Sequence, residues 1–190
     1  ERVMVMKAYM HRVLFLICLL PAVICGTASG QTTEQILRSA REAAASDRHR
    51  EAIDYYLDAV NRDSSLAAEL GREIGYQYTW GGKPDSAVIW FSRYLEIHPK
   101  ELEGMLGKAR ALSWADRKHE SLNLYRRIQG KHPRSIEARI GEARVTSWQD
   151  RNAEAEELYR KILGKYPENL QALLGLAQVI NWQGRHREAR

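Results

Sequence analysis

Four tryptophans recur along the chain at one interval, and a basic residue follows each of them. Each lies 34 residues from the next: Trp80, Trp114, Trp148 and Trp182. The basic residues come three positions later and are Lys83, Arg117, Arg151 and Arg185. Indole faces and guanidinium groups bind ligands by stacking and by charge-assisted hydrogen bonds. The pattern therefore predicts a surface for an extended peptide or a sugar polymer.

A second column of side chains strengthens this hypothesis. Arg110 and Arg144 stand four residues before their tryptophans, where Tyr76 and Gln178 occupy the same place in neighbouring copies. The predicted partner-binding residues are Tyr76, Arg110, Arg144, Gln178, Trp114, Trp148, Arg117 and Arg151. A structural interpretation competes for the tryptophans and is favoured for them. In that interpretation each ring packs between copies, and the aliphatic stem of the next basic residue covers it.

Other kinds of chemistry are not indicated by the sequence. It contains no phosphate-binding glycine loop and no nucleophile elbow. His98 and His132 precede prolines one interval apart, but no metal-ligand pairing of the HExxH type occurs on a helix. We therefore predict no catalytic residue, no metal site and no cofactor.

The first 30 residues have the composition of a secretory signal peptide. Lys7 and Arg12 precede the apolar run 13–25, and small residues follow it in the segment GTASG. The 13 apolar residues are too few for a transmembrane helix, which needs roughly 20. We expect residues 1–30 to form a signal helix that is cleaved before Gln31.

Two alternatives remain open for this segment. The apolar run could be retained as an N-terminal anchor, or Cys25 could be lipidated, although Ile24 stands where bacterial lipoprotein signals usually have a small residue. Cleavage before Gln31 would remove Cys18 and Cys25, so the mature chain would have no thiol and no disulfide. It would keep 26 Lys and Arg against 23 Asp and Glu, a net charge of +3. This balance and the predicted export argue against a nucleic-acid partner.

The 34-residue interval divides the rest of the chain into units. They are 33–67, 68–101, 102–135, 136–169 and an incomplete 170–190. In unit 136–169, apolar residues at helical spacing predict a first helix over 136–148, a break at 149–151, and a second helix that buries Ala155 and Tyr159. Pro167 then ends the unit, because proline cannot continue a helix interior.

Small and aromatic residues keep the same register. Two columns of small residues are Ala52, Ala87, Ser121, Ala155, Ala189 and Gly75, Ala109, Ala143, Ala177. An aromatic column is formed by Tyr56, Phe91, Tyr125 and Tyr159, and the closing prolines are Pro99, Pro133 and Pro167. Small side chains allow two helices to cross closely, and aromatic rings fill the space between units.

This combination resembles the tetratricopeptide repeat, a helix-turn-helix unit of 34 residues. The likeness covers residues 33–190, essentially the whole domain 31–190 that follows the signal peptide. It implies an all-α, right-handed superhelical solenoid of antiparallel helix pairs. It also implies a scaffold without enzymatic activity, whose first helices line a concave groove for a protein or peptide.

Two charges depart from the family pattern, which prefers Leu at their position. Lys108 and Glu142 lie one unit apart in first helices. We predict that they can pair across neighbouring helices, which is worth about 0 to 1 kcal/mol if the pair is exposed.

The amino-acid sequences of two segments suggest a more specific relationship. Leu173–Arg185 and Gly141–Arg151 are similar to the periplasmic repeat arms of bacterial outer-membrane β-barrel proteins, some of which export exopolysaccharide. We therefore expect a scaffold in the periplasm or at the outer membrane, with a protein or polysaccharide partner. Alternatives are a lipid-anchored envelope assembly factor and a regulatory module attached to a downstream enzyme. Contact with a membrane would require the lipid anchor or a C-terminal barrel.

The last unit predicts that the chain continues. Its first helix carries Leu173, Leu176 and Ile180, and the sequence stops about two residues into the expected second helix. Because each repeat buries its apolar face against a neighbour, we expect the natural protein to extend past Arg190. Glu1, in place of an initiator Met, suggests that the sequence is also cut at its start.

Overall fold

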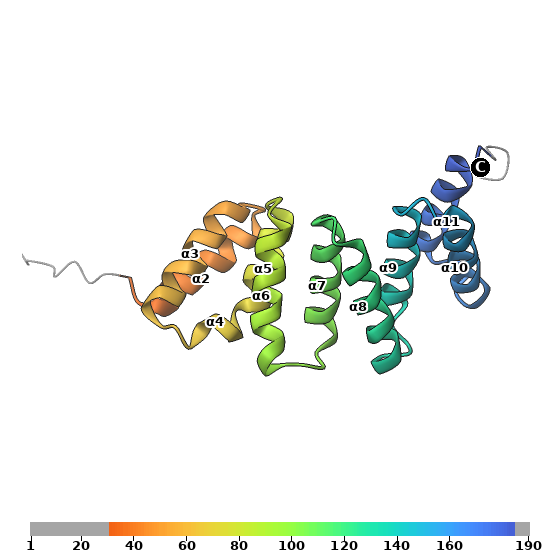
Figure 1. Cartoon of the computed structure of the whole chain (residues 1–190). Coiled ribbons are helices and arrows are strands. Elements are labelled where there is room, and N and C mark those ends of the chain that lie inside the picture. The colour runs from red at the N-terminus through yellow and green to blue at the C-terminus, as the bar shows by residue number, and fades with distance from the viewer. Residues whose placement is uncertain (1–30, 185–190) are drawn as a thin grey trace, which may run out of the picture. The chain divides into compact units, whose positions relative to one another are not determined.

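The computed structural model describes residues 31–184. The predicted signal peptide, with Cys25, lies outside the described residues, as do Arg185 and Ala189. All regular structure in the described part is helical, in ten helices (Figure 1). They are α2 (Thr33–Ala45), α3 (His49–Arg62), α4 (Leu66–Glu69), α5 (Gly71–Trp80), α6 (Pro84–Ile97), α7 (Leu102–Trp114), α8 (Lys118–Lys131), α9 (Ile136–Ser147), α10 (Asn152–Lys165) and α11 (Leu170–Trp182). None of these helices has the length and apolarity that crossing a bilayer requires.

The helices form sequential antiparallel pairs, as the 34-residue interval predicts. The paired helices α2 and α3, α5 and α6, α7 and α8, and α9 and α10 pack against each other. Each pair also packs against the next in the chain, and the short helix α4 contacts α6. The all-α class and the helix pairs are thus confirmed.

Each helix pair turns at a residue in the left-handed backbone region. Asp47, Asp116 and Asp150 have φ values of 55°, 59° and 60°, and Gly82 has 73°. Asp and Gly tolerate this region better than most residues do. The next residue, basic in each pair, becomes the N-cap of the second helix. The break predicted at 149–151 is confirmed, with Trp148 as the C-cap of α9.

Polar side chains start the first helices. Ser135 accepts a hydrogen bond from the Ala138 amide at 3.2 Å, and Asn169 accepts one from the Ala172 amide at 2.9 Å. Such caps satisfy amides that have no partner inside the helix. The prolines predicted to end the units lie in the turns just before these caps.

One first helix is interrupted. The interval predicts a single helix at the start of unit 68–101, but α4 and α5 are separated at Leu70. Gly71 comes so close to α6 that a Cβ on it would lie 2.6 Å from the Trp90 carbonyl oxygen. The close approach requires glycine here and coincides with the break.

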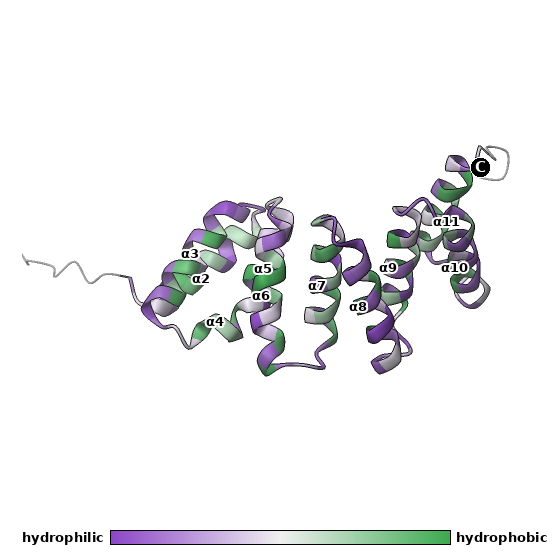
Figure 2. Ribbon diagram, viewed as in Figure 1, coloured by the Kyte–Doolittle hydropathy of each residue, from purple (hydrophilic) through white to green (hydrophobic). Residues whose placement is uncertain are grey.

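The core consists of the columns that the sequence predicts, and apolar stripes follow the helices in Figure 2. Ala52, Ala87, Ser121 and Ala155 are fully buried. The buried hydroxyl of Ser121 donates a hydrogen bond to the Ala109 carbonyl at 2.7 Å. This bond joins α7 and α8 where they cross and satisfies the polar group. The aromatic column is buried too, and its members are Tyr56, Phe91, Tyr125 and Tyr159.

A glycine column that we did not predict receives these rings. Phe91, Tyr125 and Tyr159 each lie against a glycine in the first helix of the next unit. These glycines, one interval apart, are Gly107, Gly141 and Gly175. A methyl group at any of them would fall inside van der Waals contact with the ring. Ring and glycine therefore determine how closely consecutive units stack.

The predicted pair of Lys108 and Glu142 is wrong. Glu142 accepts hydrogen bonds from Arg126 Nε and Gln129 Nε2, both at 2.7 Å and both from α8. The second helix of the preceding unit covers this position more closely than the neighbouring first helix does. Lys108 instead lies near Arg127 and Arg117, and burial together with these two charges lowers its pKa.

Candidate functional site

The predicted column Tyr76, Arg110, Arg144 and Gln178 lies on the first helices of successive units. These helices, α5, α7, α9 and α11, contact one another in sequence. We call the surface that carries this column the first-helix face. Tyr76, Arg110 and Arg144 are half-buried there, and Gln178 is exposed.

The charges of two arginines at the middle of the first-helix face act on one buried hydroxyl, that of Tyr125. Burial raises the pKa of Tyr125, while the charges of Arg144 and Arg110 act in the opposite direction. Arg144 also acts on the hydroxyl of Tyr159, whose pKa is likewise raised by burial. Arg144 therefore acts on two hydroxyls of the aromatic column, and Arg110 acts on one of them.

Neither arginine is neutralised inside the described part of the chain. No carboxylate of residues 31–184 lies within ion-pair distance of Arg110 or Arg144. The Nε atom of Arg144 is buried and has no hydrogen-bond partner there. Its Cζ lies 5.6 Å from the centre of the Trp148 ring. A half-buried cation without a counter-charge is expensive in free energy, so this is a place where an anion would bind favourably.

The tryptophans do not share one environment. Trp80, Trp114 and Trp182 are 50%, 46% and 47% exposed. Trp148 is partly buried and packs against the central core. The packing interpretation therefore describes Trp148 best, while the other three rings leave about half their surface available.

Two of the basic residues that follow the tryptophans are engaged by carboxylates. Arg117 pairs with Glu120 at 2.7 Å, and Arg151 pairs with Glu154. These are contacts within the first turn of the second helix, because each arginine is its N-cap. The cation that lies over the Trp148 ring is Arg144, from the preceding turn of α9. A binding role for Arg117 and Arg151 remains a prediction.

The structure adds a pocket at the other end of this face that sequence reasoning missed. It has a volume of about 420 Å³ and draws residues from α2, α3, α5 and α7. Its lining residues are Arg41, Ala44, Tyr56, Arg72, Glu73, Tyr76, Gln77, Trp80 and Glu103. One signal could have indicated it: Glu73 occupies the place that Gly107, Gly141 and Gly175 hold in later units.

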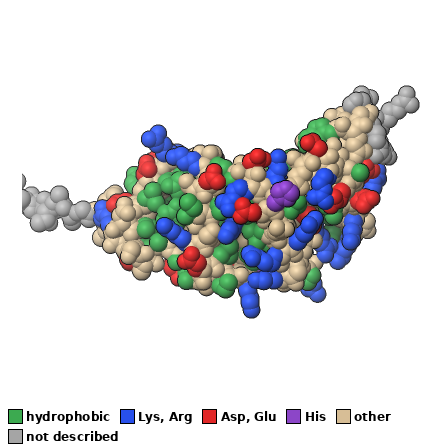
Figure 3. All heavy atoms as spheres, in the orientation of Figure 1, with side chains coloured by type: hydrophobic (Ala, Val, Ile, Leu, Met, Phe, Trp, Pro, Cys, Tyr) green, Lys and Arg blue, Asp and Glu red, His purple; other side chains and the backbone are tan. Residues whose placement is uncertain are grey.

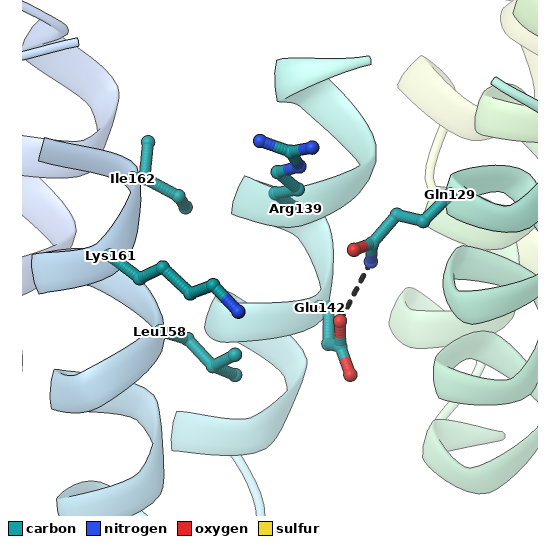
Figure 4. Close-up of a pocket in the computed structure, with 6 residues that line it drawn as sticks. All are labelled: Gln129, Arg139, Glu142, Leu158, Lys161 and Ile162. Atoms are coloured by element: carbon teal, nitrogen blue, oxygen red, sulfur yellow. Dashed lines mark hydrogen bonds between the residues drawn. The ribbon is translucent and has the colours of Figure 1, made fainter. Parts of the chain in front are cut away.

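A smaller cavity is lined by residues of α8, α9 and α10. Its volume is about 180 Å³, and Figure 4 shows its lining residues: Gln129, Arg139, Glu142, Leu158, Lys161 and Ile162. The hydrogen bonds of Glu142 to Arg126 and Gln129 already satisfy the buried carboxylate. This cavity therefore has a structural explanation.

Comparisons with known proteins agree with this architecture. Residues 149–190 match the family model described as tetratricopeptide repeat. A tetratricopeptide repeat protein from Parabacteroides merdae superposes with a TM-score of 0.75 at 15% identity, over 85% of this chain and 63% of that chain. The protein has the tetratricopeptide-repeat fold. The chain thus spans less than two thirds of the length of this structural relative.

Two further solved structures support the tetratricopeptide-repeat assignment. MamA superposes with a TM-score of 0.66 at 17% identity, covering 83% of this chain and 85% of MamA. A thermophilic tetratricopeptide repeat protein from Thermus thermophilus superposes with a TM-score of 0.66 at 16% identity, covering 83% of this chain and 86% of that chain. No curated protein matches the sequence.

Tetratricopeptide repeats are interaction scaffolds, typically without enzymatic activity, and they bind protein partners generally. Among residues 31–184, no three His, Cys, Asp or Glu side chains are grouped as a metal site would require. The first-helix face presents guanidinium groups, tyrosine hydroxyls and half-exposed indoles.

Proposed function

We propose that these repeats are an exported, non-enzymatic scaffold that binds an acidic, extended segment of a protein partner along the first-helix face. One observation carries the proposal: Arg110 and Arg144 lie at equivalent places on the neighbouring first helices α7 and α9, and no carboxylate of the described residues neutralises them. Carboxylates bind guanidinium groups through paired, charge-assisted hydrogen bonds. The Tyr125 and Tyr159 hydroxyls add donors at the same place.

Both arginines can be reached by one ligand that extends along the stack. They come from neighbouring first helices, and the axes of packed helices lie about 8–10 Å apart. An extended peptide advances about 3.3 Å per residue. Two acidic residues three positions apart would therefore reach both guanidinium groups, and the half-exposed Trp114 could stack against the residues beside them.

A peptide-display selection against the purified protein tests this proposal. We expect the selected peptides to contain Asp or Glu in pairs separated by about three positions, which follows from the helix spacing. Recovery of mainly neutral or basic peptides would contradict the proposal. Selection of sugar oligomers from a glycan array, with no peptide binding, would instead support a polysaccharide ligand.

Export is supported by the composition of residues 1–30. A periplasmic or outer-membrane location also agrees with the similarity of segments such as Leu173–Arg185 to envelope export proteins. Cell fractionation with mass spectrometry of the mature N-terminus tests this part. A start at Gln31 would support cleavage, a lipidated Cys25 would support the anchored alternative, and an intact protein in the cytoplasm would contradict export.

A further inference from the structure

We infer that the pocket beside Trp80 receives a positively charged side chain of the partner, the ammonium of a lysine or the guanidinium of an arginine. This inference rests on the proposed function, because the pocket lies on the same first-helix face. It adds a second, oppositely charged recognition point. The partner segment would then carry a basic residue at the Trp80 pocket and acidic residues at Arg110 and Arg144.

One wall of the pocket is aromatic and well supported. The Trp80 ring stacks on Tyr76, with centroids 5.2 Å apart and planes inclined by 18°. Tyr76 in turn meets the edge of Phe91 at 5.1 Å and donates a hydrogen bond to the Glu103 carbonyl at 3.2 Å. The centroid of the His49 ring lies 5.8 Å from that of the Trp80 ring. A half-exposed indole held in this way presents a face to which a cation is attracted.

Glu73 supplies an incompletely used carboxylate. Its Oε1 lies 3.3 Å from Arg72 Nη2, whereas its Oε2 is buried without a hydrogen-bond partner in the described residues. An unsatisfied buried acceptor destabilises the structure that holds it. Later units have glycine at this place, so the carboxylate is an addition specific to this step of the stack. A donor from a ligand would remove the penalty after a rotation of the Glu73 side chain.

The remaining charges of the pocket leave room for a cation. Glu103 Oε2 has only a long contact of 3.5 Å with the Tyr76 hydroxyl. Arg72 is already engaged by two carboxylates, those of Glu73 at 3.3 Å and Glu101 at 3.9 Å. Arg41 is exposed on α2 and is the other cation of the lining. The lining thus holds two carboxylates, Glu73 and Glu103, and two guanidinium groups, of which that of Arg72 is already paired.

The net charge of the repeat units changes sign along the chain in the same direction, from acidic near the pocket to basic near the arginine pair. Residues 33–101 contain nine Lys and Arg against twelve Asp and Glu, a net charge of −3. Unit 102–135 contains eight Lys and Arg against three Asp and Glu, a net charge of +5. In Figure 3, Lys and Arg side chains gather over the middle and C-terminal helices, and hydrophobic side chains gather over α2 and α3. The N-terminal units therefore attract a cation, and the middle unit attracts an anion.

A titration followed by NMR on the indole N–H signals of the full chain tests this inference. The probes are the N-acetyl methylamides of lysine, arginine, norleucine and glutamate, and Trp80→Phe assigns the Trp80 signal. We expect the lysine and arginine probes to shift this signal saturably, and the norleucine and glutamate probes to leave it in place. Equal shifts with norleucine would overturn the inference, because they would indicate apolar binding alone.

Two isosteric variants make the test specific. Glu73→Gln should raise the Kd of the lysine probe about two- to fivefold, as expected for loss of a partly exposed ion pair. Glu96→Gln removes the same charge from exposed surface on α6 and should leave that Kd unchanged. An unchanged Kd in Glu73→Gln, with the indole signals of the folded protein retained, would overturn the inference. So would a Trp80 shift with maltotriose and none with lysine.

The same spectra separate this inference from the proposed function. The Trp148 indole, below Arg144, reports on the arginine pair, and the Trp80 indole reports on the pocket. A glutamate probe that moves only Trp148 would support the acidic-segment proposal. If no basic probe then moved Trp80, the pocket inference would fail while that proposal stood. Movement of Trp80 by lysine without any response at Trp148 would give the opposite result.

Discussion

The Tyr125 ring of α8 lies against Gly141 of α9, with Cε1 and Cζ in the space where a side chain on Gly141 would begin. The same relationship joins Tyr159 to Gly175 and Phe91 to Gly107. Since the rings and the glycines belong to successive units, this contact determines the distance between repeats. It explains why the aromatic column can be fully buried in an open-ended stack.

Gly141→Ala should therefore destabilise the protein. The added methyl group forces the Tyr125 ring or the α9 backbone to move, which costs about 1–3 kcal/mol for an overpacked core. The matched control is Gly130→Ala, in α8, where an added Cβ meets no atom within 4 Å. There alanine should be neutral or stabilising by up to about 1 kcal/mol, because it favours the helix. Urea unfolding monitored by circular dichroism measures both, and equal stabilities would contradict the stacking account.

Trp148 and Trp114, one interval apart, should differ in their contribution to stability. Trp148 packs against the core, whereas Trp114 is 46% exposed. Trp148→Ala should cost about 2–4 kcal/mol, somewhat below a fully buried aromatic truncation, and Trp114→Ala about 1–2 kcal/mol. Thermal unfolding of the two variants gives the comparison. A larger loss of stability in Trp114→Ala than in Trp148→Ala would contradict the assignment of Trp148 to the core.

Tyr76 should titrate well above an ordinary tyrosine. Burial, followed by the charge of Glu103, raises the pKa of Tyr76 to about 12. Because the unfolded value is near 10, the folded state retains the proton more strongly. The resulting stability is fully present below pH 10 and is lost as the pH rises from about 10 to about 12.

Phenolate absorbance measured against pH, in the parent protein and in Tyr76→Phe, tests this expectation. The difference between the two curves should contain a step near pH 12 and none near pH 10. A step at the ordinary value would mean that the Tyr76 hydroxyl is solvated, and that the aromatic wall of the Trp80 pocket is loose. Tyr55→Phe, on α3, provides a control tyrosine that is only partly buried.

The repeated features of this fold could be predicted from the sequence, because a regular interval carries the same physical requirement many times. Ala155 and Tyr159 recur at equivalent places in each unit, so their burial could be inferred from the spacing alone. The helix predicted over 136–148 ends at Ser147, with Trp148 as its cap. The break at Leu70 could not be inferred in this way, because it occurs in one unit only, where Gly71 approaches Trp90 closely.

The candidate site was predicted only in part, because a regular interval does not reveal the contacts between different helices. The columns on the first helices indicated Arg110 and Arg144, but not that the charges of both act on Tyr125 from the second helix. Arg41, Glu73 and Glu103 come from three different helices, so the spacing within a single column does not reveal that they line one pocket. The pairing of Glu142 with Arg126 likewise depends on the packing of α8 over α9, which the spacing of first helices does not reveal.

The most direct test of the proposed binding surface compares two double variants that remove equal charge. Arg110→Gln with Arg144→Gln removes the cations of the first-helix face, and Arg127→Gln with Arg134→Gln removes two exposed cations elsewhere in the stack. The Kd for a selected acidic peptide should rise at least about tenfold in the first variant, as for loss of charge-assisted hydrogen bonds worth ~1.5–3 kcal/mol, and less than about twofold in the second. Circular dichroism should show unchanged helicity in both. Equal weakening by the two variants, or an unaltered Kd in the first, would contradict the assignment of the first-helix face.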